Sequence, residues 1–145
     1  MSGVFNQHWH FAIVGAGLSG ACLALLLARE QSQWNILLID TQNSDSPTEP
    51  DHRSSALSAS TVDVLQTMGL WSILQAKTAA ITAIDVSDRG HVGSAKLNAA
   101  EQNLSAYGHV VENAQLAAVF EQALTECPNI TCIKAPAPTL IKPRR

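Results

Sequence analysis

Apolar residues near the N-terminus form two short runs separated by a longer one. Residues 10–14 (HFAIV) end at glycines, and residues 35–40 (NILLID) form the second short run. Short apolar runs are typical of strands that are buried on both faces of a parallel sheet. Residues 18–30, between them, are apolar on nearly every side, which predicts a helix covered over most of its surface. This part of the chain therefore predicts a β-α-β unit.

A polar stretch follows, and after it the pattern becomes helical. Residues 41–52 are rich in Ser, Asp and Pro and predict a loop. Helical spacing of apolar residues begins near Ser55 and continues to Gly69, a residue type that commonly follows the end of a helix. Residues 71–77 predict another short helix.

The middle of the chain changes to a strand pattern. β-Branched residues alternate with others over residues 81–86, residues 88–90 (DRG) suit a turn, and residues 92–97 suit a return strand. We therefore predict a β-hairpin within residues 80–98.

The last predicted elements are a helix over residues 113–126, with Asn113 as its N-cap, and a strand over residues 130–133. The order of elements predicts an α/β fold, in which a Rossmann-like βαβ domain carries a β-hairpin insertion and is incomplete at the C-terminus. The expected apolar stripe of the last helix consists of Leu116, Ala117, Phe120 and Leu124.

Composition suits one domain over residues 1–145. Apolar residues make up 46% of the chain and charged residues 14%, so a core can form. The net charge is −3 and the nine Lys and Arg residues are scattered, which argues against a nucleic-acid partner. Residues 11–28 are apolar, but three glycines interrupt them and no Lys or Arg precedes them. We interpret this stretch as a strand and a helix rather than a signal peptide or a membrane span.

The cysteines give no clear metal site. Cys22, Cys127 and Cys132 form no CxxC pair, and the last two lack the second pair that a zinc site requires. We expect no metal, and we expect reduced cysteines packed as small apolar residues in a cytoplasmic protein.

The motif that points to chemistry is a glycine-rich turn, GAGLSG, between the first strand and the first helix. Asp40 ends the next strand, 20 residues after Gly20, which is the spacing of a dinucleotide-binding fingerprint. Gly15 permits the tight turn, Gly17 lets a pyrophosphate approach the backbone, and Gly20 lets the helix pack against the sheet. Phosphates would meet the helix N-terminus, and Asp40 would accept hydrogen bonds from the adenosine ribose. The predicted cofactor-binding residues of this motif are Gly15, Ala16, Gly17, Leu18, Ser19, Gly20 and Asp40.

The fingerprint alone does not distinguish FAD from NAD, and a glycine turn without any nucleotide is a further alternative. The 12-residue polar loop leads to Arg53, at the head of the predicted helix. A loop of that length in a compact domain is often functional. A cation there can meet a pyrophosphate or a ribose, although from composition alone a solvated charge at a loop end is the first interpretation of Arg53.

Three segments resemble the flavoprotein aromatic hydroxylases, the family of para-hydroxybenzoate hydroxylase. They are IVGAGLSGACLALLLA with LLID, then DHRSSALSASTVDVLQTMGLW, then AITAIDVSDRGHVGSAKL followed by YGHVVENAQLAAVF. The resemblance extends from about residue 11 to about residue 133. Within the family the chain is most similar to the ubiquinone-biosynthesis hydroxylases, and its SDRGH and GHVVEN segments are similar to those of 2-octaprenyl-6-methoxyphenol hydroxylases.

The resemblance implies an FAD-dependent monooxygenase that uses NAD(P)H and O₂ to hydroxylate a prenylated phenol in ubiquinone biosynthesis. It implies that Arg53 contacts the diphosphate and ribose region of FAD, and that His109, where relatives often have Gln, faces the cofactor. A surface histidine at a strand end is the alternative for His109. Asp40 stands where many relatives have Glu. Residues 80–98 would belong to the substrate-side sheet, and no catalytic residue can be named.

The resemblance also implies what lies outside this sequence. Relatives carry a middle Asp-Gly motif and a later Gly-Asp motif that are not found here, so we expect a truncated chain that is inactive alone and binds FAD weakly. It implies a cytoplasmic protein, peripheral to the inner membrane, with other ubiquinone-biosynthesis proteins as partners. The alternatives are a hydroxylase acting at another ring carbon, an NAD-dependent dehydrogenase domain, or a non-catalytic remnant.

Overall fold

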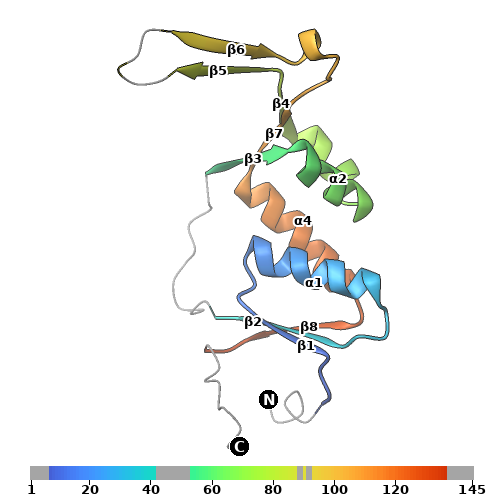
Figure 1. The fold of residues 1–145 in the computed structure, drawn as a ribbon. Helices are drawn as coiled ribbons and strands as arrows, with labels where there is room; N and C mark the ends of the chain where they lie inside the picture. Colours follow the sequence, from blue (N-terminus) through green and yellow to red (C-terminus); the bar gives the residue numbers. More distant parts are fainter. Residues whose placement is uncertain (1–6, 42–52, 88–89, 91–92, 137–145) are drawn as a thin grey trace, which may run out of the picture. The chain divides into compact units, whose positions relative to one another are not determined.

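The computed structural model describes residues 7–41, 53–87, 90 and 93–136 (Figure 1). The chain divides into two compact units, residues 1–49 with 117–145 and residues 50–116, and each has its own sheet. The mixture of helices and strands confirms the predicted α/β class. Residues 42–52 of the loop predicted over residues 41–52 lie outside the described residues, as do the turn residues 88 and 89 and residue 92 of the predicted return strand.

The first unit contains a parallel sheet with a helix on one face (Figure 1). Strand β2 (Ile36–Asp40) lies between β1 (Phe11–Val14) and β8 (Ile130–Lys134), and both pairings are parallel. Helix α1 (Leu18–Glu30) joins β1 to β2, because neighbouring parallel strands need a crossover connection. The predicted β-α-β unit is confirmed.

Burial in this unit agrees with the prediction for the central strand and differs for the helix. Residues 36–39 are each at most 5% exposed, so β2 is buried on both faces. On α1, Ala24 is fully buried, but Leu23 and Leu26 are 48% and 37% exposed. The helix is therefore not covered over most of its surface. Small residues allow one side to lie close to the sheet, and the leucines on other sides stay open to solvent.

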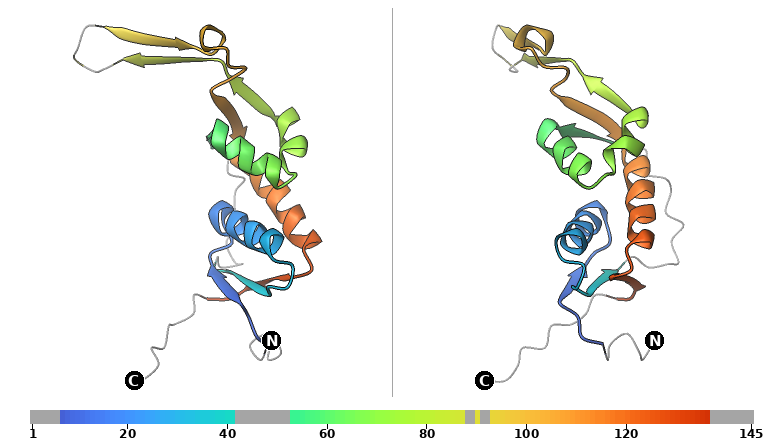
Figure 2. Two further views of the ribbon diagram at one scale, coloured as in Figure 1. Left: turned by 45° about the vertical axis from the view of Figure 1, so that its right-hand side comes forward. Right: turned by 90° about the vertical axis from the view of Figure 1, so that its right-hand side faces the viewer.

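The second unit contains an antiparallel sheet in which β7 (Gly108–Glu112) lies between β3 (Ser54–Ser58) and β4 (Thr78–Ile81). Helix α2 (Ala59–Thr67) lies beside this sheet in both turned views (Figure 2). A short helix, α3 (Trp71–Leu74), follows and confirms the second predicted helix of this region. The 3-10 turn η2 (Gln75–Lys77) connects it to β4.

The structure contradicts the predicted helix start near Ser55, with Arg53 at its head, over residues 54–58. These residues form strand β3, because their pairing with β7 satisfies their backbone groups and buries Leu57. The helix begins only at Ala59, where the Ser58 side chain accepts a hydrogen bond from the Thr61 N–H at 3.2 Å. Its end is as predicted, since Gly69 has a φ of 75°.

The predicted hairpin is present as β5 (Ala83–Ser87) and β6 (Ser94–Asn98), which pair antiparallel. Residues 78–81, which adjoin it, form the separate strand β4. After β6 comes the 3-10 turn η3 (Ala100–Gln102).

The last helix, α4 (Asn113–Glu126), has the predicted bounds. Three residues of its predicted stripe, Leu116, Phe120 and Leu124, are buried, whereas Ala117 is only half-buried and Val119 is buried instead. The strand predicted after it is confirmed as β8.

Candidate functional site

The glycine turn leaves the first turn of α1 open at its N-terminus. Gly15 has a φ of 102°, which favours glycine, and its N–H donates to the Ile39 carbonyl at 2.8 Å. Gly17 is the N-cap residue, and the first helical hydrogen bond runs from the Ala21 N–H to the Gly17 carbonyl at 2.9 Å. The N–H groups before Ala21 therefore have no acceptor within the helix, and Gly17 has no side chain to cap them. This arrangement suits an anion such as a phosphate.

The lack of a side chain has a different consequence at Gly17 and at Gly20. A Cβ atom on Gly20 would overlap the Gly15 carbonyl oxygen and would lie 3.5 Å from Ile13 Cγ2. A Cβ atom on Gly17 would meet nothing within 4 Å. Gly20 thus permits close packing of the helix on β1, and Gly17 leaves open space in front of the helix N-terminus.

Asp40 lies beside the glycine turn, on the side of the sheet that α1 covers. Ile13 faces α1, since it approaches Gly20, and Leu38 is its partner in the register. Asp40 follows Leu38 by two residues on the same strand, so its side chain lies on the same face. Gly15 and Asp40 each follow directly after the last pair of β1 and β2 residues, so both stand at the carboxyl edge of the sheet.

The Asp40 carboxylate lies on the same face of the sheet as the Cys132 thiol. Cys132 is the register partner of Leu38, so it shares the face of Asp40. Burial raises the pKa of the Cys132 thiol, and the negative charge of Asp40 raises this pKa further. Lys134, the register partner of Asp40, also lies at this edge. Sequence reasoning missed both residues, because only the pairing of β8 with β2 brings them to Asp40.

Replacement of Asp40 by Asn is expected to make Cys132 react faster with a thiol reagent at pH 8. Removing the negative charge lowers the pKa of the thiol, so a larger fraction is thiolate, the reactive form. The measurement is the rate of alkylation at each cysteine by peptide mass spectrometry. Cys22 and Cys127 are internal controls, because burial raises their pKa values without a contribution from Asp40. An unchanged alkylation rate at Cys132 would show that the Asp40 carboxylate does not lie close enough to this thiol to affect it.

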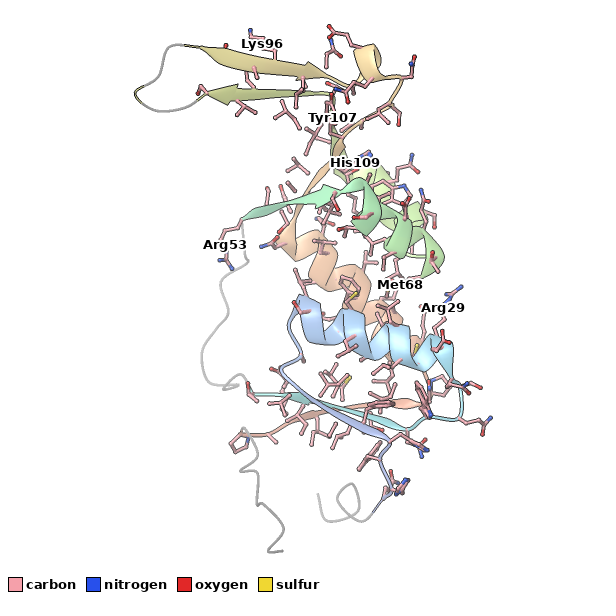
Figure 3. The ribbon with its side chains drawn as sticks, viewed as in Figure 1. Arg29, Arg53, Met68, Lys96, Tyr107 and His109 are labelled. Atoms are coloured by element: carbon pink, nitrogen blue, oxygen red, sulfur yellow. The ribbon has the colours of Figure 1, made fainter. Side chains whose placement is uncertain are left out.

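Arg53 stands in the second unit, directly before β3, with an exposed side chain (Figure 3). Its carbonyl accepts a hydrogen bond from the Asn113 N–H at 2.9 Å, and the Ser55 hydroxyl donates to Asn113 Oδ1 at 2.6 Å. These two bonds hold the start of α4 against the start of β3. Arg53 therefore has a fixed backbone position within its unit.

His109 is the second residue of β7 and is half-buried (Figure 3). Its ring packs edge-on against the Trp71 ring, with 4.8 Å between the two ring centroids. Its Nδ1 is 3.1 Å from the Thr78 hydroxyl, which itself donates to the Gln75 carbonyl at 3.0 Å. Because that hydroxyl has one proton, Nδ1 carries the hydrogen and donates to Thr78. The ring is thus oriented by its neighbours.

Among the residues that the structure describes, no helix is long and apolar enough to cross a membrane. No group of three or more His, Cys, Asp and Glu side chains in the same part of the chain could hold a metal ion.

Comparisons with known proteins agree on a single kind of domain. Residues 9–132 match the family model described as an FAD binding domain. The chain is 33% identical over 129 residues to 3-demethoxyubiquinol 3-hydroxylase of Escherichia coli (strain K12), a match that covers 87% of this chain and 32% of that protein.

Solved structures share the fold at lower identity. The p-nitrophenol 4-monooxygenase PnpA from Pseudomonas putida DLL-E4 is 18% identical with a TM-score of 0.66, over 87% of this chain and 31% of that one. The flavin-dependent monooxygenase PieE, solved with FAD and substrate, is 16% identical with a TM-score of 0.65, over 89% of this chain and 24% of that one. The chain spans about a third of the length of the first relatives that it matches.

Proposed function

Since the chain belongs to the family of FAD binding domains, we propose that it is the N-terminal part of an FAD-dependent aromatic monooxygenase and binds FAD at the Gly15–Gly20 turn and Asp40. The observation that carries this proposal is the open, uncapped N-terminus of α1 beside the Asp40 carboxylate. The first turn supplies N–H groups for the pyrophosphate, and Asp40 accepts hydrogen bonds from the adenosine ribose. The residues present therefore suit the ADP half of the cofactor.

Two residues of the second unit extend this proposal. Arg53 would contact the diphosphate and ribose region, with its position supported by the hydrogen bond of its carbonyl to Asn113. His109 would face the cofactor with Nε2, because its Nδ1 is engaged by Thr78. Both roles come from the resemblance of the DHRSSAL and YGHVVEN segments to the aromatic hydroxylases.

The proposed reaction is hydroxylation of a prenylated phenol with O₂ in ubiquinone biosynthesis, with NAD(P)H as electron donor. Bound FAD would supply the redox chemistry that activates oxygen, and the part of the protein described here would bind and orient it. The name of the Escherichia coli relative supports this substrate class. We place residues 80–98 in a substrate-side sheet. We place the protein in the cytoplasm, at the surface of the inner membrane with other ubiquinone-biosynthesis proteins, because a prenylated substrate is a lipid.

Calorimetric titration of the 145-residue chain with ADP, FAD, NAD and 2′-phosphorylated ADP tests the cofactor site. ADP and FAD should bind with similar affinity, because the contacts of the glycine turn and Asp40 all serve the ADP half. The 2′-phosphate should weaken binding at least about tenfold, since Asp40 repels it. Asp40→Asn should reduce the difference in affinity between ADP and 2′-phosphorylated ADP. Absence of ADP binding would contradict the proposal, and tighter binding of NAD than of FAD would favour a dehydrogenase domain.

A further inference from the structure

The ring of His109 lies on the packed face of the second sheet. In the register His109 stands between Leu57 of β3 and Ala80 of β4, and residues directly opposite one another share a face. Leu57 is buried, and so is Val111, which lies two residues after His109 and hence on the same face. Val110, on the other face, is exposed. His109 therefore makes its hydrogen bonds beside buried side chains, where such a bond is stronger than in water.

Two neighbours fix the direction of this ring. Trp71, which is itself buried, packs edge-on against it. Thr78 pairs with Val111 in the register, so it lies on the same face, and its hydroxyl oxygen is 3.1 Å from His109 Nδ1. Among the residues that the structure describes, Nε2 on the other side of the ring has no hydrogen-bond partner. The ring therefore presents Nε2 in a fixed direction, with its hydrogen-bonding capacity unused.

The hydrogen bonds of Thr78 decide which ring nitrogen of His109 carries the hydrogen. The Thr78 hydroxyl lies 3.0 Å from the Gln75 carbonyl oxygen, to which it can only donate. Since a hydroxyl has one hydrogen, both bonds of Thr78 form only when His109 Nδ1 donates to the hydroxyl oxygen. Nε2 then has a lone pair and accepts. In water, neutral histidine favours the opposite tautomer, with the hydrogen on Nε2, so here the tautomer is imposed by the fold.

His10 has the opposite arrangement in the same chain. The Asn35 backbone N–H donates to His10 Nδ1 at 3.0 Å, and a backbone N–H can only donate. His10 Nδ1 therefore has the lone pair, and Nε2 carries the hydrogen in the neutral ring. The two histidines differ in tautomer, which gives His109 an internal reference.

We propose that Thr78 is a positioning residue that keeps the hydrogen of His109 on Nδ1, so that Nε2 binds a hydrogen-bond donor of the ligand, a hydroxyl or an N–H group. A phosphate oxygen offers lone pairs, and it would meet the lone pair of Nε2 in the neutral ring. The choice of FAD as this ligand rests on the proposed function. His109 then meets a hydroxyl or N–H group of FAD rather than its diphosphate.

Nitrogen-15 NMR of the imidazole rings tests the tautomer in the 145-residue chain at pH 8, where unperturbed histidine side chains are neutral. The variant His109→Gln identifies the His109 signals by their loss. In the parent chain His109 Nε2 should resonate as an unprotonated nitrogen and Nδ1 as a protonated one, and His10 should show the reverse. Thr78→Val keeps the shape of the side chain without its hydroxyl and should convert His109 mainly to the Nε2–H tautomer. Thr78→Ser should restore the parent pattern.

Thr125→Val is the matched control. The Thr125 hydroxyl donates to the Gln122 carbonyl at 2.7 Å, with the same three-residue spacing as Thr78 and Gln75. Within the described part of the chain it has no hydrogen bond to a histidine. This variant should leave the His109 signals unchanged. The amide signals of β3 and β7 show that the sheet is intact in each variant.

Addition of FAD tests the polarity of the contact. Bound FAD should move the Nε2 signal to lower frequency, as accepting a hydrogen bond does, without placing a hydrogen on that nitrogen. The same titration with ADP shows which half of FAD carries the donor. The proposal is overturned by hydrogen on Nε2 in the parent chain, by a parent pattern in Thr78→Val, or by an Nε2 signal that bound FAD leaves unmoved. Because the tautomer is measured without ligand, a chain that binds neither ADP nor FAD would contradict the proposed function and leave the role of Thr78 standing.

Discussion

Gly17→Val is expected to weaken binding of ADP and FAD at least about 100-fold while lowering the thermal midpoint of the chain only by the small amount that a poorer N-cap residue costs. The added side chain would enter the space in front of the α1 N-terminus, where the phosphates are proposed to lie. The protein itself has room for it, since a Cβ atom there meets nothing within 4 Å. Gly17 also has a φ of −65° and a ψ of 179°, which valine adopts without strain.

Calorimetric titration and a thermal melt of the same sample measure both effects. Leu26→Gln is the matched control, because Leu26 is 37% exposed on the same helix and lies two turns from the N-terminus. That variant should bind ADP like the parent chain. If Gly17→Val retains the parent affinity, the phosphates do not bind at this helix end, and the assignment of the glycine turn fails.

The parts of the fold that were predicted well depend on local pattern. The bounds of α1 follow from residues that are neighbours in sequence, namely a strand that ends at glycines and a continuous run of helix-forming residues. The glycine turn and Asp40 come together because a parallel crossover returns β2 alongside β1, which the sequence spacing already implied. The most specific part of the candidate site was therefore visible in the order of the residues.

The parts that were missed depend on pairing between distant segments. Ser54–Ser58 has helical spacing, yet it is a strand because β7, some 50 residues later, offers an edge to pair with. This pairing also changed the position of Arg53, which precedes a strand rather than a helix. Cys132 and Lys134 reach the edge at Asp40 only through β8. No local periodicity reports such contacts, since they are made across the sheet.

Gly20→Ala is expected to destabilise the chain by roughly 1–3 kcal/mol and to weaken ADP binding with it. Helix propensity alone predicts the opposite sign, because alanine stabilises a helix interior by about 1 kcal/mol relative to glycine. The contact geometry decides the outcome. The new Cβ atom would overlap the Gly15 carbonyl oxygen, which belongs to the backbone and cannot rotate away, so α1 must move off β1 or the turn must rearrange.

The matched control for this substitution is Gly17→Ala, which adds the same methyl group three residues earlier, where nothing lies within 4 Å. Urea unfolding of the two variants beside the parent chain measures the free energy of unfolding of each. We expect Gly17→Ala to unfold slightly below the parent midpoint, because alanine is a poorer N-cap residue than glycine, and Gly20→Ala to unfold well below both. A Gly20→Ala chain as stable as the parent would show that the helix does not need its close approach to the sheet. The phosphates would then bind to a helix end whose position is less tightly fixed than the structure indicates.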